Sequence, residues 1–125
     1  MIENLDISDF EWMNEIHLKS FGKNLSPSDF KEPYKIIGIR QKAYMIYTNV
    51  LDEAEIIYIA VADEYKRQGI AKRIIQSLCA DIFLDVNENN TPAINLYKSC
   101  GFIEYQRRKN YYHDADAILM KYERK

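Results

Sequence analysis

Cysteine, histidine and long apolar runs are scarce in this sequence. Cysteine occurs only as Cys79 and Cys100, and histidine only as His17 and His113. These residues are too few and too widely spaced for a disulfide framework or a zinc site, so we expect buried, reduced thiols on two predicted helices and no bound metal. No segment is apolar enough to span a membrane, and the N-terminus lacks the features of a signal peptide. We therefore expect a cytoplasmic protein that does not bind membranes.

The sequence also lacks an excess of positive charge. Its formal net charge is −2, and its isoelectric point is about 5.7, so we expect no direct binding to nucleic acid. The two phosphate-loop patterns of nucleotide enzymes, G-x-x-x-x-G-K-[ST] and G-x-G-x-x-G, are absent. With 47% hydrophobic and 29% charged residues, the 125 residues are typical of a folded chain. We expect one domain over residues 1–125.

Hydrophobic periodicity predicts an α/β fold. Ser8 and Glu11 have the spacing of a helix capping box, with Phe21 among the core-facing residues of the helix. Thr91 is a good N-cap for a later helix that begins with Pro92. The expected strands are 34–39, 43–50, 55–62, 82–86, 102–108 and 115–122, and the expected helices are 8–20, a short one after Ser26, 70–79 and 92–100.

The most informative segment runs from Val61 to Leu78. An apolar strand, residues 56–61, enters a polar turn and then the sequence Gly69-Ile-Ala71 at the start of a helix. Unpaired N–H groups at a helix start bind anions, and small residues leave them uncovered. Three cations surround this turn, at Lys66, Arg67 and Lys72. The turn therefore suits a pyrophosphate, although an ordinary strand–turn–helix with a solvated basic turn has the same pattern.

The residues Lys66-Arg-Gln-Gly-Ile-Ala71 resemble the acyl-CoA pyrophosphate loop of the GCN5-related N-acetyltransferases, [RQ]-x-x-G-x-[GA]. Lys66 departs from that pattern but keeps a cation. Residues 82–102, a strand, an Asn-rich turn and a helix ending in Gly-Phe, are similar to the second CoA-contacting segment of this family. Within the family, the matches over residues 50–121 are closest to the bacterial ribosomal-protein alanine N-acetyltransferases, the RimI group.

The resemblance implies a GNAT-type α/β sandwich with a mixed central sheet, in the order β-α-α-β-β-β-α-β-α-β-β. It implies acetyl-CoA as co-substrate and no metal. The backbone of the strand end would bind the pantetheine arm and polarise the thioester, and the loop would bind the pyrophosphate. Asn90 would contact CoA, or else serve as a turn residue with a local side-chain bond. The implied cofactor-binding residues are Ile59, Ala60, Val61, Lys66, Arg67, Gln68, Gly69, Ile70, Ala71, Lys72 and Asn90.

The resemblance also implies a catalytic pair. Asp85 occupies the position of the family's glutamate general base in Leu84-Asp-Val86, and Tyr97 that of the family's tyrosine general acid. The alternatives are that Asp85 caps the following turn and that Tyr97 packs on the sheet. Tyr111 and Tyr112 match a tyrosine pair near the acceptor cleft, and we expect at least one to line the peptide site rather than pack at an edge.

Three functions remain open on the sequence. The first is acetylation of a protein N-terminal α-amine, with the N-terminal alanine of a small-subunit ribosomal protein as the implied partner. The second is acetylation of a lysine side chain or a small-molecule amine. The third is a non-catalytic acyl-CoA-binding module, which Asp85 in place of glutamate favours and the retained Tyr97 opposes. The acceptor and the oligomeric state cannot be read from the sequence.

Overall fold

The computed structural model describes residues 1–124, and it confirms the predicted α/β class and order of elements. The seven strands follow the hydrogen-bonded order β1-β2-β3-β4-β5-β7-β6, with β4 and β5 parallel. The strands are β1 Glu3–Asn4, β2 Lys35–Ile39, β3 Ala43–Val50, β4 Glu53–Val61, β5 Asp81–Asn87, β6 Ile103–Tyr112 and β7 Ala115–Tyr122. The α-helices are α1 Phe10–Phe21, α2 Ile70–Gln76 and α3 Thr91–Ser99, and the 3₁₀ turns are η1 Ile7–Asp9, η2 Pro27–Phe30 and η3 Asp63–Tyr65.

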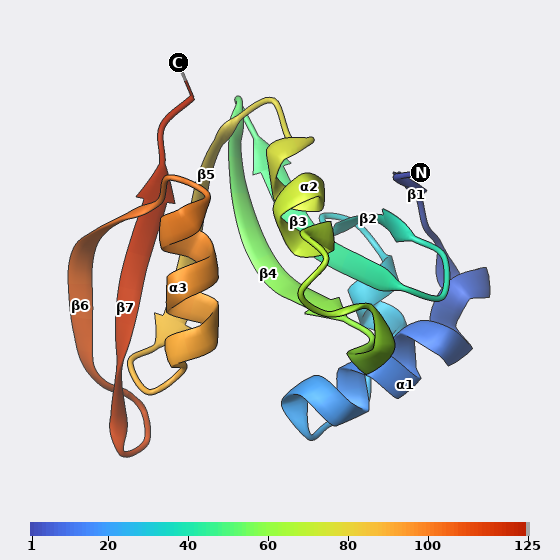
Figure 1. Cartoon of the computed structure of the whole chain (residues 1–125), viewed down its shortest axis with the longest axis horizontal. Coiled ribbons are helices and arrows are strands. Elements are labelled where there is room, and N and C mark those ends of the chain that lie inside the picture. Colours follow the sequence, from blue (N-terminus) through green and yellow to red (C-terminus); the bar gives the residue numbers. More distant parts are fainter. Residues whose placement is uncertain (125) are drawn as a thin grey trace. The chain divides into compact units, whose positions relative to one another are not determined.

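The chain divides into two compact units (Figure 1). The first contains Met1–Asn49 and Ile56–Leu78, which include α1, α2 and most of β4. The second contains Val50–Glu55 and the chain from Cys79 onward, in which β6 and β7 form a long hairpin, drawn in orange and red. No helix within residues 1–124 is long and apolar enough to cross a membrane.

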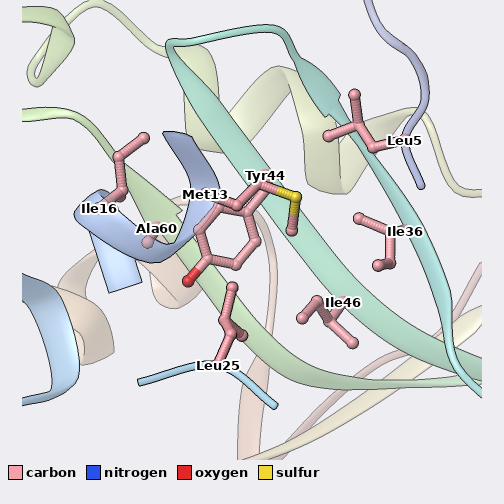
Figure 2. Packing of buried hydrophobic residues seen from close by; sticks show 8 residues of the cluster. All are labelled: Leu5, Met13, Ile16, Leu25, Ile36, Tyr44, Ile46 and Ala60. Atoms are coloured by element: carbon pink, nitrogen blue, oxygen red, sulfur yellow. The ribbon is translucent and has the colours of Figure 1, made fainter. Parts of the chain in front are cut away.

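The core of the first unit is built around Tyr44 of β3, which is completely buried. Figure 2 shows its ring among apolar side chains from α1 and the neighbouring strands. Met13 and Ile16 of α1 enter this core as predicted, because they lie three residues apart on one helix face. Phe21 does not: its side chain is 41% exposed, since α1 ends there and Gly22 turns the chain away in the left-handed conformation.

Two predicted helix starts are wrong in detail. The capping box lies at η1, between Asp6 and Asp9, and not between Ser8 and Glu11. The N-cap of α3 is Asn90, whose side chain accepts a hydrogen bond from the Ala93 N–H at 3.2 Å, so Thr91 is already helical. In each case two polar residues compete for one cap, and backbone geometry decides between them.

Helix α2 is shorter than the predicted helix over 70–79. It ends at Gln76, and the Ser77 hydroxyl donates to the Ile74 carbonyl at 2.6 Å, a local bond that competes with helix continuation. Cys79 therefore lies outside any helix and is exposed, against the expectation of a buried helical thiol. Cys100, at the C-terminal end of α3, is buried as expected.

His17 of α1 is buried in the first unit. Its side chain is 1% exposed, and its Nδ1 lies 2.5 Å from the Tyr44 hydroxyl. The rings of Phe21 and Tyr58 pack on the imidazole at centroid distances of 4.7 and 4.6 Å. Burial, despite the nearby Asp29 carboxylate, lowers the pKa of His17 below its ordinary value of 6.5.

We expect this buried histidine to make folding stability depend on pH. Between the lowered pKa and about 6.5, the unfolded chain binds a proton that the folded chain does not, so the free energy of unfolding falls as the pH falls through this window. Urea unfolding at pH 7.5 and 5.5 measures the loss. His17→Gln should remove most of the difference, whereas His113→Asn, at an exposed turn, should keep it. An equal pH dependence in both variants would contradict the assignment.

Candidate active site

The predicted phosphate loop lies in the first unit, between η3 and α2. Arg67 and Gly69 have φ values of +65° and +75°, on either side of Gln68. Alternation of left- and right-handed backbone turns successive N–H groups toward one side and forms an anion-binding concavity. A Cβ built on Gly69 would meet no atom within 4 Å, so space is open beside it. The loop geometry therefore fits a phosphate group.

The charged side chains of the loop are arranged more loosely than the backbone. Lys66 Nζ lies 3.0 Å from Asp63 Oδ1, and this hydrogen bond lowers the pKa of Asp63. Both side chains are more than half exposed, so the pair is weak and Lys66 can leave it for another anion. Arg67 is exposed and Lys72 is half-buried. The three predicted cations thus lie on the loop and its helix start, at or near the surface.

The end of β4 leads into this loop and is held by the β2–β3 turn. The Ala62 N–H donates to the Lys42 carbonyl at 2.7 Å, and Lys42 Nζ lies 5.0 Å from the Tyr65 ring centroid. Of the predicted pantetheine-binding residues, Ala60 is buried in the core, whereas Ile59 and Val61 are half-buried. A pocket of about 450 Å³ opens beside this strand end, lined by Val61, Ala62, Asp63 and Glu64 together with α1 and Gln41.

A bulky residue at Gly69 should weaken acetyl-CoA binding. Gly69→Val adds a side chain to a left-handed residue of the proposed phosphate loop, and we expect the Kd for acetyl-CoA to rise by about tenfold or more. The matched control is Gly22→Val, because Gly22 has a similar φ of +72° and equally open space. Isothermal titration should show a normal Kd for the Gly22 variant. Equal affinities in the two folded variants would refute the loop assignment.

Asp85 lies on β5 in the second unit. Strand β5 alternates buried and half-buried residues, which places Asp85 on the face opposite Leu84 and Val86. The side-chain caps of the following turn come from Asn87, which accepts from the Asn89 N–H at 2.8 Å, and from Asn90. The side-chain caps of this turn therefore come from Asn87 and Asn90, and the catalytic role of Asp85 stays a prediction.

Tyr97 lies on α3 in the same unit and is 8% exposed. Its ring packs on Phe102 at a centroid distance of 5.6 Å. Burial, with smaller contributions from Cys100 and Tyr112, raises the pKa of Tyr97 to about 12. The phenol therefore keeps its proton at every physiological pH, so it can donate a hydrogen bond to an anion but is a weak proton source.

Tyr112 interacts electrostatically with both Asp85 and Tyr97. Burial and then the Asp85 carboxylate raise its pKa, and Tyr112 in turn contributes to the raised pKa of Tyr97. The rings of Tyr111 and Tyr112 pack edge to face, with their centroids 5.0 Å apart. The Arg108 guanidinium lies over the Tyr111 ring, 5.5 Å from its centroid. Tyr112 thus interacts electrostatically with Asp85 and with Tyr97, and exposed Tyr111 packs against Tyr112.

Asn90 has the local bond that the sequence allowed as the alternative to a CoA contact. Its side-chain oxygen is engaged with the Ala93 N–H at the start of α3. The Nδ2 group of the same amide keeps its donor capacity, so a CoA contact stays a prediction. Across residues 1–124, no group of three or more His, Cys, Asp or Glu side chains is arranged to hold a metal ion.

The sequence did not reveal a cluster of charges beside the tyrosine pair. Asp116 of β7 lies within reach of Arg107, Lys109 and the backbone of Asn110, and its N–H donates to Glu88 at 2.6 Å. The only signal was that Asp116 belongs to a segment that resembles the family. Its contact with Glu88 joins residues 28 positions apart, which no local pattern can predict.

Comparison with known proteins adds a family match. The sequence profile described as "Acetyltransferase (GNAT) family" matches residues 36–102. A "[Ribosomal protein bS18]-alanine N-acetyltransferase" from Escherichia coli (strain K12) is 38% identical over 93 residues. The alignment covers 65% of this chain and 63% of that relative, so the chain spans less than two thirds of the relative's length.

Solved structures extend the similarity to nearly the whole chain. The crystal structure of the ribosomal-protein-S18-alanine N-acetyltransferase from Escherichia coli has a TM-score of 0.85 and 30% identity, covering 98% of this chain and 92% of that one. NAA60 from Arabidopsis thaliana, solved in complex with acetyl-CoA, has a TM-score of 0.84 and 19% identity, covering 98% and 97%. The second likeness shows the fold alone.

Proposed function

Because the chain belongs to the acetyltransferase (GNAT) family, we propose that it transfers an acetyl group from acetyl-CoA to a protein N-terminal α-amine. The acceptor that we propose is the N-terminal alanine of a small-subunit ribosomal protein. The names of the Escherichia coli relatives support this choice, because both acetylate ribosomal protein S18 by name. We place the reaction in the cytoplasm, where ribosomal proteins meet acetyl-CoA.

One observation supports the proposal: Asp85 and Tyr112 lie on the same face of the sheet in the second unit, and Tyr112 contributes to the raised pKa of the buried Tyr97. Acyl transfer to an amine needs one group that accepts the ammonium proton and one that stabilises the leaving thiolate. Asp85 and Tyr97 are groups of these two kinds. A module that only bound acyl-CoA would have no need of the pair.

Residues of the first unit fit acetyl-CoA, which would supply the acetyl thioester. The left-handed backbone at Arg67 and Gly69 and the open space beside Gly69 suit the pyrophosphate. In the proposal, residues 66–72 bind it through backbone N–H groups, helped by the cations of Lys66, Arg67 and Lys72. The backbone of residues 59–61 binds the pantetheine arm, and the side-chain amide of Asn90 adds a further contact.

Asp85 accepts the proton of the incoming ammonium in this proposal, directly or through one water. An N-terminal α-amine has a pKa of roughly 7.7–8, so most of it is protonated at pH 7 and a base that accepts this proton increases the reactive fraction. Tyr97 donates a hydrogen bond to the departing thiolate. Because a thiol has a pKa of about 8.5 and the pKa of Tyr97 is about 12, the phenol stabilises the thiolate without giving up its proton.

A CoA-release assay on three kinds of acceptor tests the proposal. We expect turnover on a peptide that begins with alanine and resembles the N-terminus of a small-subunit ribosomal protein. The same peptide with a blocked N-terminus and an internal lysine is the matched control, and it should not react. Small amines are the third kind of acceptor. Turnover only on the lysine peptide or on small amines would show that the acceptor is not a protein N-terminus. Tight acetyl-CoA binding with no turnover on any acceptor would support the non-catalytic alternative instead.

A further inference from the structure

The hairpin of β6 and β7 contains a large irregularity next to the tyrosine pair. Arg108 pairs with Ala117, and the next pair is Tyr112 with Ala115. Three residues of β6, at positions 109–111, therefore stand opposite the single residue Asp116 of β7. The extra residues of such a bulge have no ladder partner, so contacts outside the ladder can stabilise its shape.

The Asp116 carboxylate makes such contacts. Its Oδ1 accepts a hydrogen bond from the Asn110 N–H at 2.9 Å, and Asn110 has a φ of +53°. Its Oδ2 lies 3.2 Å from Arg107 Nη1 and 3.7 Å from Lys109 Nζ. The side chain is only 13% exposed. One carboxylate thus binds Asn110, which has the left-handed backbone, and two basic residues that precede it.

Asp116 is itself anchored to the end of β5. Its N–H donates to Glu88 Oε2 at 2.6 Å, and its carbonyl accepts from the Glu88 N–H at 3.0 Å. Arg107 completes the arrangement, because the same Nη1 that contacts Asp116 lies 3.1 Å from Glu88 Oε1. The bulge is therefore tied to the turn that follows β5, at Glu88, three residues after Asp85.

The bulge decides where Tyr112 stands along β7. If the register of Arg108 and Ala117 continued unbroken, Asn110 would face Ala115 and Tyr112 would lie in the turn. The inserted residues move Tyr112 by two positions, about 7 Å at about 3.4 Å per residue. Asp85 pairs with Leu119, an even number of residues from Ala115, so Tyr112 and Asp85 lie on the same face of the sheet.

We infer that Asp116 is a positioning residue for the acceptor side of the proposed acetyltransferase site: its carboxylate holds the bulge that sets the position of Tyr111 and Tyr112, and Tyr112 lies on the same face of the sheet as Asp85. This inference rests on the proposed function. The Asn110 hydrogen bond, and then the Arg107 guanidinium, lower the pKa of Asp116, so the carboxylate stays charged at neutral pH. Asp116 acts on the acceptor only through the tyrosines.

Two substitutions at Asp116 and one control test this inference. Asp116→Ala removes both carboxylate oxygens, and the KM for the alanine peptide should rise about tenfold while the KM for acetyl-CoA stays within about twofold. Asp116→Asn keeps an acceptor for the Asn110 N–H and should restore the peptide KM to within about threefold of the natural value. Lys109→Ala removes an 80% exposed side chain from the same bulge and should change neither KM.

A structural readout separates this inference from the proposed function. Cross-strand NOEs between Tyr112 and Ala115 report the register directly and need no substrate. Their loss in Asp116→Ala, together with the raised peptide KM, is the expected result. Retained NOEs, or lost NOEs with an unchanged peptide KM, would overturn the positioning role. If the natural protein acetylates no peptide, the proposed function and the acceptor role fall together, and the NOEs then report only a structural bulge.

Discussion

Replacing Tyr97 by phenylalanine is expected to lower kcat by about 10²-fold, the usual scale for loss of a general acid or an oxyanion donor. The ring and its packing on Phe102 are kept, so only the hydroxyl is lost. Affinity for acetyl-CoA should change little, because the hydroxyl is needed only when charge develops on the sulfur. Steady-state kinetics with the alanine peptide, together with equilibrium binding of acetyl-CoA, measures both quantities.

The pH profile gives a second test of Tyr97. We expect kcat to rise with pH as the amine loses its proton. Because the pKa of Tyr97 is raised to about 12, ionisation of the phenol should cause no decline in kcat below about pH 10. Tyr105→Phe is the matched control: Tyr105 lies on β6 in the same unit and is 44% exposed, and its variant should keep full activity. Full activity in Tyr97→Phe would show that the leaving thiolate is stabilised elsewhere.

Asp85→Asn is expected to lower kcat at pH 7 by roughly 10- to 100-fold. The neutral amide cannot accept a proton from the incoming ammonium. The deficit should shrink above about pH 9, where an α-amine with a pKa of roughly 8 is already neutral. Rates at pH 7 and pH 9.5 with the same peptide measure this convergence.

Two further variants sharpen the test of Asp85. Asp85→Glu restores the residue of the family pattern and its longer reach, and it should be at least as active as the natural protein. Asp81→Asn is the matched control, because Asp81 lies on the same face of β5 but pairs its carboxylate with the Arg124 N–H at 2.8 Å. Full activity of Asp85→Asn at pH 7 would place the base elsewhere or leave proton transfer to water.

The sequence by itself determined the order of the elements and the segments that carry the site. Periodicity and turn residues suffice for this, because alternation along β5 and the glycine before α2 are local patterns with local causes. Gly69 could also be expected at the turn before α2, since its left-handed backbone favours glycine. Tyr97 and Asp85 were identified by their resemblance to family motifs. Such a resemblance implies a role for each residue but does not show its burial or its pKa.

Only the tertiary structure decided how those residues behave. Asn90 and Thr91 are both suitable N-cap residues in the sequence, and only the backbone conformation shows that Asn90 is the cap. Burial raises the pKa of Tyr97 and lowers that of His17, and burial is a property of the packed unit. The bulge held by Asp116 depends on contacts with Glu88 across 28 residues. Local patterns fix elements, whereas charge, exposure and register arise only where distant segments meet.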